Sequence, residues 1–364
     1  MKIAFLFDEC MELGGAQRVI NNLANQFAEE YNYEVEVINF YRRVDKDYFI
    51  YNSAVKITYL NIFLKHKNFL VKYIKKISSM KILKKYLLKE NYDIIIGVSA
   101  KFNIYLVQVK KGISAKIIGT EHIFYEGHSL KTRIRKRLYY KKLDMLSVLT
   151  DYDYEKYSKF LDKLIKIHNP IPNNFKFNGY NTESKKILAA GRLSDQKGFD
   201  LLIKAMPKVI EKYPNWELNI FGEGKEKEKL ENLIKEYKLE KNVFIKKYSN
   251  EFYKTAEDYS FYVMSSRYEA FPCVLIEIQA KGLPAVSFDC KTGPNEIIND
   301  GKDGILVEPE NISKLSEAII DMIEKDKERI EMSKNAVENS KKFTIDKISA
   351  QWKDLFENLL REGD

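Results

Sequence analysis

Two glutamates eight positions apart, Glu269 and Glu277, lie in the segment RYEAFPCVLIE. Pro272 predicts the first turn of a helix there, because its missing amide hydrogen would have no partner in that turn. Free amides at a helix start favour an anion such as a phosphate. We expect Glu269 to bind a sugar hydroxyl and Glu277 two ribose hydroxyls; the plain alternative is two solvated glutamates. The amides expected to hold the phosphate belong to Cys273, Val274 and Leu275.

Two cations flank a predicted loop in the stretch GRLSDQKGFDLL, which begins at the end of the predicted strand KILAAGRL. Arg192 stands at the end of that strand and Lys197 lies just before a helical pattern. Arginine offers a planar fork and lysine a mobile point charge, so the pair suits a diphosphate. The alternative is a pair of exposed surface cations.

The first predicted strand is followed by FDECMELGGAQRV, in which Gly14 and Gly15 lead into a helix from about Ala16. Two glycines let the backbone approach a ligand closely, and the free amides of the helix start favour an anion. Alternatively, the two glycines only ease a tight turn. The spacing is not that of a dinucleotide-binding fingerprint.

A histidine, His122, follows a predicted buried strand in GTEHIFYEGH. The chain has only four histidines. A lone histidine is more often structural than catalytic, but its place at the end of a strand makes His122 a candidate for contact with a ligand.

The positive charge is concentrated in the first half of the chain. Residues 1–170 hold 30 Lys and Arg against 18 Asp and Glu, a net charge of +12 within a total of +9. In residues 130–142, Leu130, Ile134 and Leu138 form a helical stripe, which suits a helix lying on an anionic membrane. A solvated charged face is the alternative. The basic residues around the stripe are Lys131, Arg133, Arg135, Lys136 and Arg137.

Residues 65–89 are also basic, but less simply arranged. On a helix, Lys72, Lys75 and Lys76 cluster on one face, whereas the lysines between 81 and 89 fall roughly opposite. We therefore expect either a break near Ser78 and Ser79 or different roles for the two clusters.

These residues need a scaffold of strands and helices. Short apolar runs alternate with helical patterns in both halves, as in parallel sheets covered by helices. We expect two doubly wound domains, residues 1–170 and 171–343, joined near a linker at 168–186, with a last helix in 344–364 packing on the first domain. The local motifs follow strands, where open α/β sheets bind ligands.

Composition excludes several classes. The chain is 45% hydrophobic, and it has no apolar run of the ~20 residues that span a bilayer. The start MKIAFLFDEC does not resemble a signal peptide, and three scattered cysteines indicate neither disulfides nor a metal site, so we expect a reducing cytoplasm. A metal-dependent transferase would use an Asp-x-Asp triplet, but Asp151 and Asp153 begin a helical pattern. No nucleic-acid-binding motif accompanies the positive charge.

Together the stretches resemble the family 4 glycosyltransferases, which have the GT-B fold of two Rossmann-like domains. The matching motifs are Gly-Gly-Ala, Gly-Arg-Leu with Lys197-Gly198, FGEG at 221–224 and Glu-x7-Glu. GGAQRV, TEH, LSVLT and WKDLF resemble bacterial enzymes that extend polyprenyl-diphosphate-linked oligosaccharides, including the GalNAc transferase of bacterial N-glycosylation. A sugar-nucleotide epimerase of the same fold is the alternative activity.

The resemblance implies a retaining transfer from a UDP-sugar at the inner face of the cell membrane, without a metal or other cofactor. It implies that Arg192 and Lys197 stabilise the leaving diphosphate, and that Glu269 and His122 contact the transferred sugar. Lys72, Lys75 and Lys76 match a helix that holds the acceptor's diphosphate. Ala270-Phe271 replaces the usual Gly-Leu or Gly-Phe, so the donor sugar does not follow. The residues implied at the donor site also include Gly14, Gly15, Gly222, Tyr248, Phe271, Cys273, Val274, Leu275 and Glu277.

Overall fold

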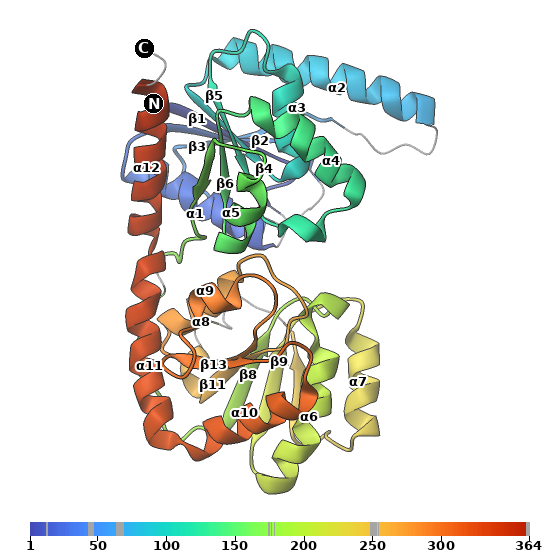
Figure 1. Ribbon diagram of the computed structural model, residues 1–364, viewed down its shortest axis with the longest axis vertical. Helices are drawn as coiled ribbons and strands as arrows, with labels where there is room; N and C mark the ends of the chain where they lie inside the picture. The colour runs from blue at the N-terminus through green and yellow to red at the C-terminus, as the bar shows by residue number, and fades with distance from the viewer. Residues whose placement is uncertain are drawn as a thin grey trace. The chain divides into compact units, whose positions relative to one another are not determined.

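The computed structural model divides the chain into two compact units (Figure 1). Unit 1 comprises Met1–Pro170 with Ile345–Asp364, and unit 2 comprises Ile171–Thr344. The residues that the structure describes are 1–11, 14–42, 47–62, 69–173, 175, 177, 179–247, 253 and 255–361, with the side chains of 69–73 excepted.

Unit 1 is built on a parallel sheet with the strand order β3-β2-β1-β4-β5-β6-β7 within the described residues. Its strands are β1 (Lys2–Phe7), β2 (Glu34–Asn39), β3 (Val55–Tyr59), β4 (Ile94–Val98), β5 (Lys116–Thr120), β6 (Met145–Val148) and β7 (Leu164–Lys166). Its helices are α1 (Gly15–Glu29), α2 (Phe69–Glu90), α3 (Ala100–Val109), α4 (Leu130–Tyr139), α5 (Asp151–Ser158) and α12 (Ile345–Arg361).

Unit 2 repeats the plan, with the strand order β10-β9-β8-β11-β12-β13. Its strands are β8 (Lys186–Ala190), β9 (Glu217–Phe221), β10 (Val243–Lys246), β11 (Phe261–Met264), β12 (Ala285–Phe288) and β13 (Gly304–Val307). Its helices are α6 (Phe199–Lys212), α7 (Lys227–Glu236), α8 (Cys273–Ala280), α9 (Pro294–Ile297), α10 (Ile312–Glu324) and α11 (Asp326–Ser340). The prediction of two doubly wound parallel sheets is confirmed.

Burial on both faces explains why the strands are so apolar. In β1 the five successive residues Ile3–Phe7 are buried, and in β4 all five residues are, although neighbouring side chains along a strand point to opposite faces. In each sheet the order reverses beside the first strand, β1 or β8, which is the switch point where open α/β sheets bind ligands at the carboxyl ends of their strands.

The last helix, α12, packs in unit 1 against α1 (Figure 1). Phe356 meets Phe27 edge to face, with ring centroids 5.4 Å apart. Hydrogen bonds join Gln26 to Asp346 and Tyr31 to Ser349. The chain leaves unit 2 beside its own entry point, where the Ile171 amide donates to the Phe343 carbonyl at 2.7 Å.

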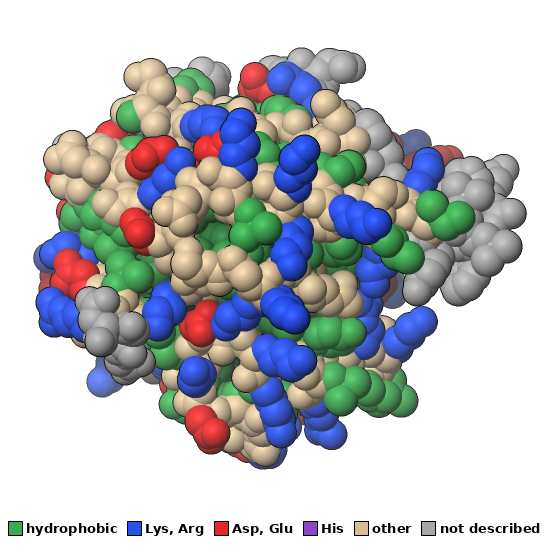
Figure 2. All heavy atoms as spheres, turned by 90° about the horizontal axis from the view of Figure 1, so that it is seen from above, with side chains coloured by type: hydrophobic (Ala, Val, Ile, Leu, Met, Phe, Trp, Pro, Cys, Tyr) green, Lys and Arg blue, Asp and Glu red, His purple; other side chains and the backbone are tan. Residues whose placement is uncertain are grey.

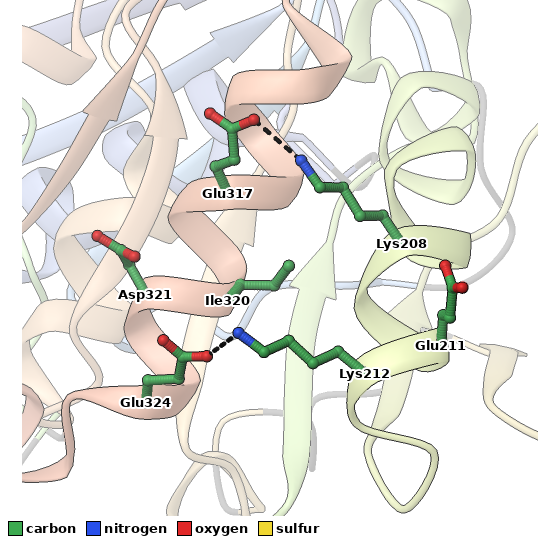
Figure 3. A pocket seen from close by; sticks show the side chains of 7 residues that line it. All are labelled: Lys208, Glu211, Lys212, Glu317, Ile320, Asp321 and Glu324. Carbon is green, nitrogen blue, oxygen red and sulfur yellow. Dashed lines mark hydrogen bonds and ion pairs between the residues drawn. The ribbon is translucent and has the colours of Figure 1, made fainter.

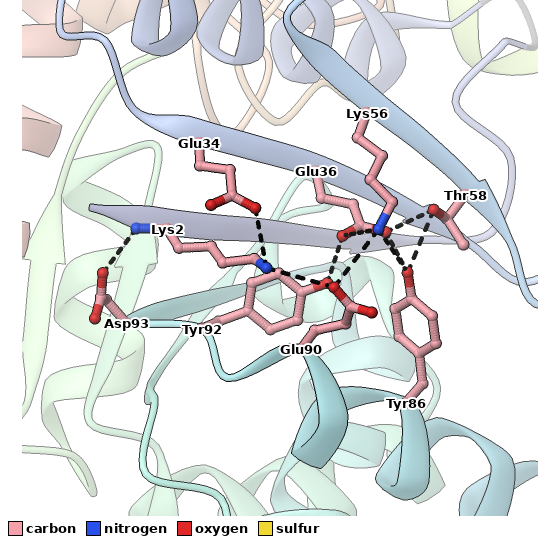
Figure 4. A network of polar contacts seen from close by, with 9 residues as sticks. All are labelled: Lys2, Glu34, Glu36, Lys56, Thr58, Tyr86, Glu90, Tyr92 and Asp93. Atoms are coloured by element: carbon pink, nitrogen blue, oxygen red, sulfur yellow. Dashed lines mark hydrogen bonds and ion pairs between the residues drawn. The ribbon is translucent and has the colours of Figure 1, made fainter.

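A polar network fastens the end of α2 to the sheet of unit 1 (Figure 4). Glu36 of β2 is only 2% exposed, and it accepts hydrogen bonds from Thr58, Tyr92 and Lys56 at 2.5, 2.6 and 3.2 Å. Tyr86 of α2 donates to the same carboxylate. Burial alone would raise the pKa of Glu36, but these hydrogen bonds lower it. The network therefore fixes α2 while keeping Glu36 ionised.

Candidate functional site

A charged contact lies beside the carboxyl ends of β8 and β11 in unit 2. Lys197 Nζ is 2.6 Å from Glu269 Oε1, and Ser266 Oγ donates to the same oxygen at 2.6 Å. The close approach depends on Gly198, whose φ is +60° and whose added Cβ would lie 2.0 Å from the Ser265 carbonyl oxygen. The fold thus brings together Lys197 and Glu269, two predicted site residues from distant parts of the sequence.

Arg192 stands close by in sequence, two residues after β8, and it is exposed. Its guanidinium makes no ion pair or hydrogen bond with any described residue, so its positive charge remains uncompensated. By contrast, Arg267 is held by both carboxylate oxygens of Asp200, at 2.9 and 2.8 Å. An arginine without an ionic partner, near the carboxyl ends of the strands of a parallel sheet, is suited to bind an anionic ligand.

Helix α8 carries the second glutamate of the motif. It begins at Cys273, with Pro272 as its N-cap rather than within its first turn. Glu277 is completely buried and accepts a hydrogen bond from Tyr253. The Val274 amide has no hydrogen-bond partner among the described residues. The Leu275 amide donates to the Pro272 carbonyl at 3.0 Å, so the prediction that it is open to a phosphate is wrong.

The loop between Glu269 and Glu277 packs against Thr292, Gly293 and Phe343. The ring of Phe271 is 4% exposed and meets Phe343 edge to face at 5.4 Å, so its side chain lies in the protein rather than open to a donor. Thr292 donates to the Glu269 carbonyl, and Gly293 lies against Pro272. These contacts fix the backbone that presents Glu269.

Gly222 follows β9 and has a packing role. An added Cβ there would lie 2.1 Å from the Gly191 carbonyl oxygen, so only glycine lets the two loops meet. Tyr248 lies outside the described residues.

In unit 1, Gly14 is the N-cap of α1 and Gly15 its first residue. A Cβ on Gly15 would meet nothing within 4 Å, and one on Gly14 would meet only the flexible side chain of Gln17. Gly14 has extended backbone, with φ of −176°. Packing within the chain therefore requires neither glycine, which favours close approach of a ligand over a tight turn.

His122 lies just past β5, and its Nε2 is 3.2 Å from Thr120 Oγ1. Both residues line a small cavity within unit 1, together with Ser147 and His168. Burial of the ring lowers the pKa of His122 to about 4 although the charge of Glu121 opposes this, so the imidazole is neutral at pH 7. A neutral imidazole can donate or accept a hydrogen bond but carries no charge to a ligand.

Helix α4 has an outer apolar stripe, as predicted. Leu130, Ile134 and Leu138 are 66%, 51% and 66% exposed. Lys131 and Arg137 are also exposed, whereas Arg133 and Arg135 are half-buried. Figure 2 shows Lys and Arg side chains spread over one face of the molecule, with hydrophobic side chains between them.

Lys136 does not belong to this surface. Its side chain is fully buried, and Nζ lies 2.9 Å from a carboxylate oxygen of Glu121. The prediction that Lys136 contacts a membrane is therefore wrong, because the residue points inward from α4 to a buried partner that helical periodicity cannot reveal.

Helix α2 runs unbroken from Phe69 to Glu90, so no break occurs at the serines. Ser78 and Ser79 instead bond back to the carbonyls of Ile74 and Lys75, at 2.8 and 2.6 Å. Lys75 and Lys76 are half-buried, with Lys76 Nζ 5.6 Å from the centre of the Tyr105 ring. Burial and the nearby charge of Arg135 lower the pKa of Lys76. The side chain of Lys72 lies outside the described residues.

Sequence reasoning missed Glu121 and Tyr253, which contact the expected site residues or their neighbours. Glu121 directly precedes His122, and a charged residue at the end of a buried strand is a usable signal. Tyr253 gives no such signal, because its partner Glu277 is distant in sequence.

Three other kinds of site were considered among the described residues: a surface groove, a metal-binding cluster and a membrane-spanning helix. A groove between α6 and α10 is crossed by ion pairs from Lys208 to Glu317 and from Lys212 to Glu324, and no predicted site residue lines it (Figure 3). Within the described part of the chain, no cluster of three or more His, Cys, Asp or Glu is placed to hold a metal. No helix there is long and apolar enough to cross a membrane.

Known proteins are similar to this chain in sequence and in fold. Residues 170–341 match the family model of glycosyl transferases group 1. An uncharacterized glycosyltransferase of Haemophilus influenzae is 30% identical over 97% of this chain and 99% of its own length. A Campylobacter jejuni α-1,4-N-acetyl-D-galactosaminyltransferase, named for a diNAcBac-PP-undecaprenol-linked GalNAc acceptor, is 26% identical over 97% of both chains.

A solved structure has a similar fold. It is a TarM mutant of S. aureus in complex with fondaparinux, alpha-GlcNAc-glycerol and UDP. The TM-score is 0.80 at 19% identity, over 98% of this chain and 100% of that one.

Proposed function

The chain belongs to the group 1 glycosyl transferases, and from this membership we propose that it transfers a sugar from a UDP-sugar to a surface glycan. The proposed acceptor is carried on polyprenyl diphosphate at the inner face of the cytoplasmic membrane. The transfer retains the configuration of the donor sugar and uses no metal or other cofactor. The name of the Campylobacter relative supports the lipid-linked acceptor, and the UDP in the TarM complex supports the nucleotide.

The observation that carries the proposal is the contact of Lys197 with Glu269. Arg192, whose charge is uncompensated among the described residues, precedes Lys197 in the segment that follows β8. In our proposal Arg192 and Lys197 neutralise the donor diphosphate, and Glu269 binds hydroxyls of the transferred sugar. Glu277 binds the ribose, and the amides of Cys273 and Val274 complete the phosphate site. Charge stabilisation of the leaving diphosphate is the main contribution to rate, and the leaving phosphate itself takes the acceptor's proton.

Unit 1 contributes to the sugar and phosphate contacts in this proposal. The neutral ring of His122 contacts the transferred sugar through a hydrogen bond. Gly15 lets the backbone at the start of α1 come close to the phosphates, in accord with the open space around it.

The basic helices of unit 1 serve the acceptor. We assign the acceptor diphosphate to Lys72, Lys75 and Lys76 of α2, and membrane docking to the outer face of α4. Exposed apolar side chains with cations beside them bind anionic bilayers, each cation contributing about 1 kcal/mol near the surface. The docking residues are Leu130, Lys131, Arg133, Ile134, Arg135, Arg137 and Leu138.

A panel of UDP-sugars, each with a polyprenyl-diphosphate-linked acceptor, tests the proposal. We expect transfer from at least one donor, and Arg192→Ala should reduce it ~100-fold or more, the scale of losing one preorganised charge donor. Lys204→Ala, which removes an exposed cation from α6, is the control and should change little.

Three results would contradict the proposal. Near-normal turnover of Arg192→Ala would remove that residue from the mechanism. Conversion of a UDP-sugar without acceptor would instead indicate an epimerase, and tight RNA binding without transfer would indicate a nucleic-acid-binding protein.

A further inference from the structure

A buried polar cluster lies beneath α4, and the proposed chemistry does not use it. Its centre is Glu121, which is 2% exposed. Lys136 reaches Glu121 Oε2 at 2.9 Å and His128 Nε2 reaches the same oxygen at 3.2 Å, while Tyr140 donates to Oε1. Lys136 Nζ also donates to the hydroxyl of Tyr157 at 2.8 Å. Both oxygens of Glu121 are therefore held by partners from residues 128–140.

The backbone around Glu121 is held as well. The Glu121 amide donates to the Ser147 carbonyl at 3.2 Å, and Asn103 of α3 donates to the Thr120 carbonyl at 3.0 Å. Thr120 Oγ1 bonds to the Gly97 carbonyl and lies beside His122 Nε2. Hydrogen bonds with β4, α3 and β6 therefore fix the position of Thr120 and Glu121, the two residues before His122.

The stability of the fold alone does not explain this arrangement. Burying a lysine and a glutamate costs several kcal/mol per ion, and well-packed apolar residues of the same size are often as stable or more so. Burial would raise the pKa of Glu121, but the charge of Lys136 and the hydrogen bond from His128 lower it to about 2. Glu121 is thus held ionised, while burial lowers the pKa of Lys136. The contact between the two side chains has a defined direction that apolar side chains would not provide.

We propose that Glu121 and Lys136 are positioning residues, which hold the turn before His122 so that its ring meets the donor sugar in one orientation. This inference rests on the proposed function of His122. Lys136 acts from the inner face of α4, and its role is separate from that of the exposed outer face.

The test uses the double variant Glu121→Gln/Lys136→Met in the full chain. It removes one charge of each sign, leaves an acceptor for Tyr140, and leaves no unpaired buried ion. We expect kcat for transfer to fall ~10- to 100-fold, since small misplacements of a reacting group have effects of that size. The KM for the UDP-sugar and the midpoint of thermal unfolding should change little.

The control is Lys110→Met/Asp144→Asn, which removes another ion pair of unit 1, with 2.7 Å between Nζ and Oδ2. It should keep kcat within ~2-fold, because Asp144 contacts β5 only near its start, at the Ile117 amide five residues before His122, and asparagine keeps an acceptor for that amide. If the control lowered kcat as much as Glu121→Gln/Lys136→Met does, the loss of kcat would follow from removing an ion pair anywhere in unit 1 and would not indicate positioning of His122.

A second measurement needs no activity. Proton NMR can follow the titration of His122, assigned among the four histidines with His122→Gln. Loss of the Glu121 charge by itself would lower the pKa of His122 further. A titration nearer ~6.5 than about 4 would therefore show that the ring has lost its position and gained water, which is the expected result.

The outcomes separate the two proposals. Absence of transfer by the unchanged protein contradicts the proposed function, while the titration still decides whether the pair positions the ring. An unchanged titration, an unchanged kcat, a kcat loss matched by the control, or loss of folding in the double variant would each overturn the positioning role.

Discussion

Lys197 and Glu269, both expected to bind the donor, form an ion pair with each other when no ligand is bound. The ammonium is neutralised by the carboxylate at 2.6 Å, so a donor diphosphate must share Lys197 with Glu269. Arg192 has no such partner among the described residues and is available at once. Binding of phosphate by Lys197 therefore requires a change in its contact with Glu269, whereas binding by Arg192 does not, and the spacing of the two cations in the sequence does not show this difference.

Substitution of Glu269 and of Glu277 should have different effects on the affinity for UDP. Glu269→Gln releases Lys197 from its partner, so UDP affinity should stay equal or rise while transfer falls. Glu277→Gln should weaken UDP binding ~10- to 100-fold, since a hydrogen bond to a charged group contributes about 1.5–3 kcal/mol. Calorimetry with UDP measures both variants, and Glu228→Gln, an exposed carboxylate on α7, is the control. Equal losses of affinity in the two variants would contradict the assignment.

The neutral ring of His122 should make stability depend on pH. Its pKa is about 4 in the folded chain against ~6.5 unfolded, so the unfolded state binds a proton first as the pH falls. The contribution of His122 is complete above pH ~6.5 and is lost progressively down to about pH 4. His122→Gln should therefore lose less thermal stability than the unchanged protein between pH 7 and pH 4.5. Calorimetry at both values checks this, and equal losses would show that His122 is not buried neutral.

At the scale of elements, α4 shows what periodicity can and cannot predict. The stripe of Leu130, Ile134 and Leu138 follows from helical spacing, and the structure exposes all three. The inward direction of Lys136 does not follow from spacing, because it depends on Glu121 at the end of β5. Likewise, Ser78 and Ser79 suggested a break in α2, but their hydroxyls bond to carbonyls three or four residues earlier within an unbroken helix.

The outer face of α4 should determine binding to anionic membranes. Reversing Lys131, Arg135 and Arg137 to glutamate removes about 3 kcal/mol of attraction and adds repulsion. Binding to anionic liposomes at low salt should fall ~100-fold or more, as measured by sedimentation. The matched control reverses three exposed lysines of α7, Lys227, Lys229 and Lys235, which changes the net charge equally. An equal loss in the control would show that total charge, not this helix, decides binding.

At the scale of the whole molecule, the sequence predicts the two sheets well, because strands buried on both faces are continuous apolar runs. The strand predicted in KILAAGRL, for example, is present as β8, which takes in its first five residues. The missed strand, β7, has three residues and half-buried side chains at the edge of its sheet. The candidate site was harder to predict, because Tyr253, Phe343 and Glu121 act through partners that only the folded chain brings near.

Because α12 packs in unit 1, we expect α12 and residues 1–170 to unfold together in one transition. Phe356 is completely buried against Phe27, so Phe356→Ala should destabilise unit 1 by about 3–5 kcal/mol. UDP, whose ribose and charged diphosphate contacts we place in unit 2, should raise the unfolding midpoint of that unit more and so identify its transition. In calorimetry of the full chain, Phe356→Ala should lower the midpoint that UDP raises less. Phe261→Ala, which empties a buried site beside Trp216, should instead lower the midpoint that UDP raises more. A shift of that second midpoint by Phe356→Ala as large as that by Phe261→Ala would show that α12 stabilises both units alike.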